Sequence, residues 1–253
     1  MSRTFYVGLA ASCAAAAMII TAAPARADVI TLSSVRDNTL YQDATGSLSN
    51  GAGEFFFAGN TNTSVTRRGL VRFDLSSLPA GATITNVTLT LHMSMTSSGA
   101  TNVSLHRVLA DWGEGTSDAP GGEGAGVAAT TGDATWLHTF YNTSFWASAG
   151  GDFNAASSAL TSVNAVGFYS WSSAQMIADA QQWQATPASN FGWLLHGDES
   201  AASTTKRFDT RENLTASFRP ALVIEYTPVP GPGALALLGL AGVIGGHGRR
   251  RER

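Results

Sequence analysis

The sequence predicts an all-β domain, an antiparallel β-sandwich with one short helix, flanked by two terminal segments that are not part of the sandwich. Three observations support this prediction. Apolar and polar residues alternate over much of the chain, which is the period-two pattern of half-buried strands. Gly, Ser, Thr and Asn are abundant and suit many turns, whereas helical periodicity is confined to one stretch. The roughly 200 residues between the terminal segments are a normal length for one sandwich.

Residues 1–27 are predicted to be a cleavable signal peptide. Phe5–Ile20 is apolar and rich in alanine, and Ala25-Arg26-Ala27 has the small-x-small pattern that signal peptidase recognises. Cys13, the one cysteine, lies inside the apolar run and is removed with it. The mature chain therefore has no thiol, which excludes disulfides, cysteine nucleophiles and thiolate metal sites.

The strands of the domain, residues 28–227, are predicted from their alternation. Val29–Tyr41 is predicted as a strand, a turn at Arg36-Asp37-Asn38 and a second short strand. Leu70–Leu75 places three apolar side chains on one face and charged ones on the other. His92, on the polar face of the longest strand, is expected at the sheet surface. The remaining predicted strands of this half are Phe55–Ala58, Val87–Met93, Val103–Val108 and Val166–Trp171.

One helix is predicted at about Ala174–Gln184, with Ser172 or Ser173 as its N-cap. Its apolar residues recur at helical spacing and should cover one open end of the sandwich. They are Met176, Ile177, Ala180 and Trp183.

The segment Phe191–Tyr226 is predicted to close the domain with three strands, Gly192–His196, Lys206–Thr210 and Ala221–Tyr226. Charged residues lie among these apolar strands, where an unpaired charge is costly. We therefore expect an ion pair between an arginine and an acid in this segment. The residues considered are Arg211, Glu212 and Arg219, with Asp37, Asp74 and Asp209 as partners.

Two blocks of the sequence carry a family resemblance. Gly69–Leu91 (GLVRFDLSSLPAGATITNVTLTL) and Phe191–Tyr226 (FGWLLHGDESAASTTKRFDTRENLTASFRPALVIEY) resemble, in content and order, the DNRLRE family of bacterial secreted modules. The nearest match to the string that names the family is Asp37-Asn38-Thr39-Leu40. The resemblance covers roughly residues 28–227. It implies a jelly-roll β-sandwich related to carbohydrate-binding modules, some of which bind acidic polysaccharides such as alginate.

Residues 228–253 are predicted to be a sorting and anchoring tail. A Pro-Gly-rich linker is followed by the apolar run Ala234–Gly245 and a basic end, Arg249, Arg250, Arg251 and Arg253. This order resembles the PEP-CTERM sorting signal, with Pro230-Gly231-Pro232 in place of the Pro-Glu-Pro motif. The apolar run, predicted as a short helix, is below the roughly 20 residues of a spanning helix, but snorkelling arginines extend it. With these arginines in the cytoplasm, the domain faces outward.

Charge and motif content exclude several functions. Residues 28–227 carry nine Lys and Arg against seventeen Asp and Glu, a formal charge of −8, which argues against a basic nucleic-acid surface. The sequence has no GxSxG, HExxH or CxxC motif. A glycosidase-like pair among Asp152, Asp198 and Glu199 is the remaining catalytic interpretation, and we predict no enzyme.

A glycine-rich acidic loop follows the strand at Val103–Val108. Its carboxylates suit a hard cation such as calcium, although they lack the ordered spacing of an EF-hand. The alternative is a solvated insertion between strands. The candidate ligands are Asp111, Glu114, Asp118 and Glu123.

A sugar-binding platform needs flat aromatic rings beside hydrogen-bonding side chains. We expect Trp112 and Trp146 on loops, where they can stack on sugar rings, and Trp136 in the core. The polar candidates beside them are Asp111, Glu114, Asn142 and Asp152. The sequence thus predicts a non-catalytic exported module that binds extracellular polysaccharide at the cell surface or in the matrix. The alternative is a structural envelope or biofilm protein without a specific ligand.

Overall fold

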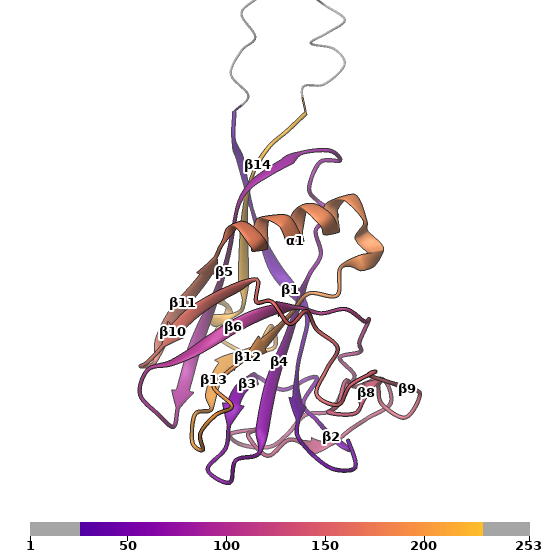
Figure 1. Ribbon diagram of the computed structural model, residues 1–253, viewed down its shortest axis with the longest axis vertical. Coiled ribbons are helices and arrows are strands. Elements are labelled where there is room, and N and C mark those ends of the chain that lie inside the picture. Colours follow the sequence, from indigo (N-terminus) through magenta and orange to yellow (C-terminus); the bar gives the residue numbers. More distant parts are fainter. Residues whose placement is uncertain (1–25, 230–253) are drawn as a thin grey trace, which may run out of the picture.

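The computed structural model describes residues 26–229. The predicted signal peptide, with Ala25 at its cleavage motif, and the predicted sorting residues from Pro230 onward lie outside the described residues. Within residues 26–229, no helix is long and apolar enough to cross a membrane. The described chain begins and ends at the same end of the molecule, where β1 starts beside the end of β14 (Figure 1).

The domain is all-β with one α-helix, as the sequence predicts, and its main strands form two layers of antiparallel pairs. One layer contains the first half of β1 (Asp28–Tyr41), β14 (Ala221–Thr227), β5 (Thr83–Thr96), β11 (Gly167–Ser172), β13 (Lys206–Asp209) and β3 (Phe55–Asn60). The other contains the second half of β1, β4 (Thr66–Phe73), β12 (Trp193–His196), β6 (Thr101–Arg107) and β10 (Ala159–Val163).

The two layers are joined by strands that pass from one to the other, so that β1, β14, β5, β13, β3 and β4 form a closed ring of pairings. β1 pairs with β14 up to Ser33 and with β4 from Ser34, and a bulge between Ser34 and Arg36 marks the change. A β-bulge bends its strand, which allows β1 to change pairing partners at this corner. The turn predicted at Arg36-Asp37-Asn38 is therefore wrong, because these polar residues lie in the strand just after its corner.

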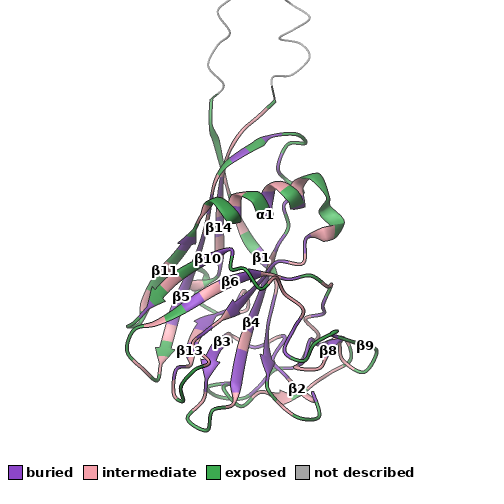
Figure 2. Ribbon diagram, in the orientation of Figure 1, coloured by how far each residue is buried: buried purple, intermediate pink, exposed green. Residues whose placement is uncertain are grey.

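The main core fills the space between the layers (Figure 2). The alternation predicted along each strand places one side chain in two inside, as Val71 and Phe73 on β4 show. Trp171, Trp193 and Phe208 are almost fully buried here, so they contribute the largest apolar surfaces. The edge strands β10 and β11 belong to different layers and contact each other.

The helix α1 (Ala174–Ala185) begins at the predicted cap, where Ser173 Oγ accepts a hydrogen bond from the amide of Met176 at 3.0 Å. Its buried face packs on β5 and closes one end of the main core, and its outer face is exposed (Figure 2). Asp179 is buried on the same helix and accepts hydrogen bonds from Ser158 Oγ and Trp193 Nε1. A 3₁₀ turn, Pro187–Ser189, follows the helix.

A second core lies on the outer face of the β1, β4, β12 and β6 layer, under the long segment 108–158. Leu40, Leu70 and Leu194 project from the strands into this core, and Trp112 and Trp146 come from the covering segment. Short pairings stiffen that segment. They are β2 (Leu48–Ser49) with β7 (Val127–Ala128), and β8 (His138–Phe140) with β9 (Ser144–Phe145).

The closing segment forms the three predicted strands, β12, β13 and β14, but distributes them over both layers. The turn between β13 and β14, which includes the 3₁₀ turn Ala216–Phe218, lies over His92. The Phe218 ring stacks on the His92 ring at 3.9 Å, and His92 Nδ1 is 2.5 Å from Asp209 Oδ2. His92 is thus buried, and the sheet-surface position expected for it is wrong because this turn covers it.

Candidate functional site

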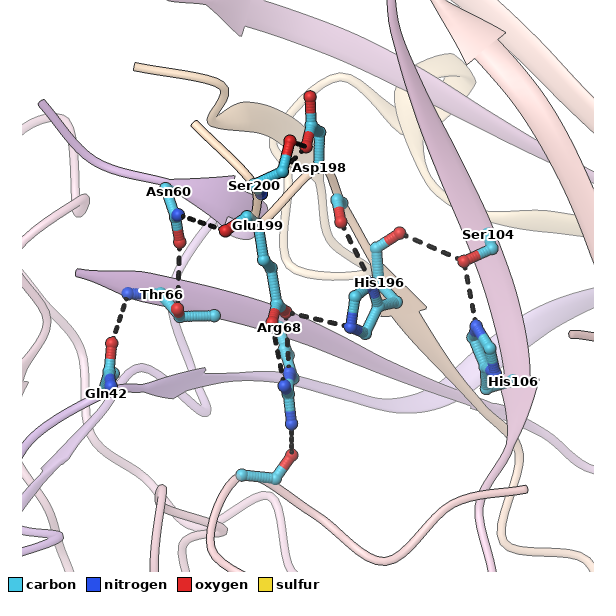
Figure 3. Close-up of polar contacts among 12 residues, drawn as sticks. Gln42, Asn60, Thr66, Arg68, Ser104, His106, His196, Asp198, Glu199 and Ser200 are labelled. Carbon is cyan, nitrogen blue, oxygen red and sulfur yellow. Dashed lines mark hydrogen bonds and ion pairs between the residues drawn. The ribbon is translucent and has the colours of Figure 1, made fainter. Parts of the chain in front are cut away.

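The best candidate site lies on the outer face of β4, β12 and β6, beyond the edge of the second core (Figure 3). β4 contributes Arg68, β12 ends with His196, and β6 contributes Ser104 and His106. Strand alternation places them together, because the residues next to them on β12 and β6, such as Leu195 and Leu105, point into the main core. The turn after β12 adds Glu199.

Arg68 and Glu199 form a two-point ion pair at the centre of the site. Arg68 Nε and Nη2 donate to the two carboxylate oxygens of Glu199 at 2.8 and 2.9 Å, and Nη1 donates to the carbonyl of Gly150 at 2.9 Å. His196 Nε2 lies 3.3 Å from the same carboxylate. The side chains of Arg68 and Glu199 are 15% and 20% exposed, so the pair is held rigidly yet remains in contact with solvent.

Aromatic rings flank this ion pair. The Arg68 guanidinium lies 5.0 Å from the ring centre of Trp136 and 5.3 Å from that of Phe153, which is within the range of cation–π attraction. Phe153 also meets the His106 ring edge-on at 5.3 Å. Both Trp136 and Phe153 are only partly buried, so part of each ring borders the open surface.

The surface is hollowed on both sides of the ion pair. One hollow, of about 570 Å³, is lined by Arg68, Asp152 and Phe153 among others. The other, of about 470 Å³, is lined by Ser104, His196 and Glu199 among others. The two side chains of the ion pair therefore each border one hollow, and together the hollows make a shallow, extended site.

Hydrogen bonds at both ring nitrogens fix the orientation of His106. Its Nδ1 lies 2.8 Å from the carbonyl oxygen of Asn154, which can only accept, so Nδ1 carries the proton. Nε2 lies 2.9 Å from Ser104 Oγ, which also lies 3.3 Å from the carbonyl oxygen of His196. Burial lowers the pKa of His106, and the nearby positive charges of His196 and Arg68 act in the same direction.

The carboxylates around the site each have hydrogen-bond or ion-pair partners among the described residues. A glycosidase needs one carboxyl group whose pKa is raised so that it can donate a proton. Hydrogen bonds from the hydroxyl and amide of Ser200 instead lower the pKa of Asp198. Asp152 accepts from the amides of Ala147 and Ser148, and Glu199 is engaged by Arg68.

The structure buries both tryptophans that the sequence assigned to a sugar platform. Trp112 is 0% exposed and donates from Nε1 to the carbonyl of Phe191 at 2.8 Å. Trp146 is 6% exposed and donates to the carbonyl of Thr135 at 2.9 Å. The expectation that they stack on a ligand is wrong, because both fill the second core. Trp136, expected in the core, packs against the second core but is only partly buried there.

The polar partners expected beside those tryptophans are scattered. Asp111 pairs with two arginines of the sheet, and Glu114 pairs with Arg211. Asn142 is exposed in the turn between β8 and β9 with a positive φ. Asp152 alone lines the candidate site.

The four carboxylates proposed as calcium ligands do not converge either. They are Asp111, Glu114, Asp118 and Glu123. Asp118 is exposed, and Glu123 accepts from Asn50 Nδ2 and from the amides at the start of β3. Within residues 26–229, the one group of three acidic or histidine ligands contains Glu114 but none of the other three.

A second hollow site lies between the end of α1 and β4, with a volume of about 660 Å³. It contains Arg36 and Arg72, whose Nη1 atoms both lie 3.3 Å from Asp111. Its aromatic lining residue is Trp183, which is 2% exposed and offers no free ring face. The Arg68 surface combines charge with accessible rings and is therefore the better candidate.

Sequence reasoning missed Arg68, His106 and Phe153 as site residues. The one signal in the sequence is the polar run His196-Gly197-Asp198-Glu199 at the end of a predicted strand. A comparison of the chain with protein-family models and with curated proteins finds no match. The assignment of the site therefore rests on its geometry.

Proposed function

We propose that this protein is a non-catalytic, exported module that binds polysaccharide through the surface around Arg68 and Glu199. The observation that carries the proposal is the guanidinium of Arg68, which lies near the rings of both Trp136 and Phe153 in a side chain that is 15% exposed. Aromatic rings beside fixed hydrogen-bonding groups are the features that sugar recognition requires. The jelly-roll fold that the DNRLRE-like blocks suggest is part of the proposal, and its support is the antiparallel pairing of the main strands, six of which close into a ring.

An acidic polysaccharide fits the surface better than a neutral one. Three of the five N–H groups of Arg68 are used within the described chain, which leaves two for a ligand. Arginine binds carboxylates strongly because two parallel hydrogen bonds accompany the charge attraction. Glu199 and His196 then hydrogen-bond to sugar hydroxyls beside the uronate carboxylate.

Titration calorimetry with a soluble polyuronate and a neutral glucan tests this function. Arg68→Ala should weaken polyuronate binding about tenfold or more, because a hydrogen bond to a charged group contributes about 1.5 to 3 kcal/mol. Arg72→Ala is the matched control, since it removes an arginine from the same strand outside the site. Equal binding by parent and Arg68→Ala would contradict the site. Absence of binding to every glycan would favour the structural envelope protein.

Export and surface sorting belong to the same proposal, with the export and sorting machinery as partners and the tail as a transient membrane anchor. The test is deletion of residues 230–253. The truncated chain should appear in the medium with an unchanged melting temperature, because the described domain has a complete core without those residues. A truncated chain that stays cell-associated would contradict the role of the tail.

A further inference from the structure

Three carboxylates from distant parts of the sequence converge at the corner of β1. Asp37 lies in β1 just after the bulge, Glu114 lies in the segment after β6, and Glu212 lies in the turn after β13. One oxygen from each of these side chains lies within 4.8 Å of the other two. This cluster is separate from the Arg68 surface.

Asp37 gives a second, independent indication of a ligand. The residue is 0% exposed, and its Oδ2 accepts from Ser34 Oγ and from the amide of Arg211, both at 3.1 Å. Its other oxygen, Oδ1, is buried with no hydrogen-bond partner among the described residues, and the same holds for Glu212 Oε2. Unpartnered buried carboxylate oxygens are rare and costly, so they call for a bound group.

The charge balance points to a cation. Arg211 is the one basic side chain that pairs with these acids in the described chain, through Glu114 and Glu212. With all three acids ionised, the cluster has a formal charge of −2.

We propose that Asp37, Glu114 and Glu212 form a divalent-cation site, and that Ca²⁺ is the ion it takes. The ligand set consists only of oxygens, which calcium prefers, and water completes its coordination. With Ca–O distances of 2.3 to 2.6 Å, two oxygens on one ion lie at most about 5 Å apart, which matches the spacing of the cluster. The ion joins β1, the segment 108–158 and the turn after β13. Its role is therefore to stabilise the packing of the two cores against each other.

The competing arrangement is a single proton shared between Asp37 and Glu212. It explains the unpartnered oxygens without a metal, but it predicts no response to calcium. The full chain, freed of metal with a chelator at pH 7.5, should bind about one Ca²⁺ in titration calorimetry. Its melting temperature should rise by about 5 to 10 °C at a free Ca²⁺ concentration 100-fold above Kd. Mg²⁺ at the same concentration should shift it less.

Variants locate the ion. Asp37→Asn and Glu212→Gln should each abolish the calcium-dependent rise, whereas Asp118→Asn, an exposed acid of the covering segment, should retain it. If Asp37→Asn does not fold, the Glu212→Gln variant alone tests the site. The fold should tolerate this substitution, because Glu212 lies in a turn and is partly exposed. No heat and no thermal shift in the parent would overturn the proposal in favour of the shared proton. Equal binding by the parent and both site variants would place the ion elsewhere.

Discussion

Arg211 and Glu114 form a two-point ion pair between the turn after β13 and the segment 108–158 that covers the second core. Arg211 Nε and Nη2 donate to the two carboxylate oxygens of Glu114 at 2.9 and 2.5 Å. The predicted ion pair of the closing segment is thus confirmed, but the partners of Arg211 are Glu114 and Glu212 rather than Asp37, Asp74 or Asp209. Because Glu114 also accepts from the amide of Asp37, the pair fixes the corner of β1.

Arg211→Ala should lower the free energy of unfolding by about 2 kcal/mol. The substitution leaves the carboxylate of Glu114 without its main partner, and the partial exposure of Arg211 limits the loss to less than that of a fully buried pair. Arg219→Ala is the control, because Arg219 is exposed and contacts the carbonyl of Asn213. Urea denaturation measures both variants, and equal midpoints would refute a role for the pair in stability.

Glu123→Ala should cost about 3 kcal/mol of stability. Glu123 accepts from Asn50 Nδ2 at 2.7 Å and from the amides of Glu54 and Phe55 at 3.1 and 2.9 Å, and removal of its carboxylate leaves these donors without partners. Asp118→Ala, at an exposed position of the same loop, should stay within about 0.5 kcal/mol of the parent. A Glu123→Ala variant as stable as Asp118→Ala would show that water replaces the lost acceptor.

Trp112→Ala should destabilise the protein by about 3 to 5 kcal/mol, as Trp193→Ala should in the main core. Trp136→Ala should cost less stability, because its ring borders solvent, but should weaken polysaccharide binding. Thermal melts and glycan affinity, measured on all three variants, separate the two roles. Loss of glycan affinity in a stable Trp112→Ala protein would instead support the sugar-binding role that the sequence predicts for Trp112.

The contribution of His106 to stability should depend on pH. The pKa of His106 is lower in the folded protein than the roughly 6.5 of an unfolded chain, so the unfolded state gains the proton first as the pH falls. The stability of the parent relative to His106→Gln should therefore be greatest above pH 6.5 and decline below it. His196, Arg68 and Glu199 face the ring and are unchanged in both proteins. Urea midpoints of the two proteins at pH 7.5 and 5.5 test this, and a constant difference would contradict it.

Local patterns predicted the strands and the helix because each needs only its own residues. The alternation in Leu70–Leu75 and the cap at Ser173 are such cases. The corner at Asp37 was not predictable in this way, because the amide and the carboxylate of Asp37 form hydrogen bonds with residues 77 and 174 positions away. Burial of Trp112 and Trp146 likewise depends on a second core that only the folded chain assembles.

The placement of β14 has a mechanical consequence. β14 is paired on one side with β1 along Asp28–Ser33 and on the other with β5, and it ends where the described chain ends. The opposite end of β1 pairs at Leu40 with Arg68. A pull between the C-terminal end and a ligand held at Arg68 therefore acts along the strands. Since the interstrand hydrogen bonds are perpendicular to that direction, they resist together in shear instead of opening one by one, and the domain should withstand tension.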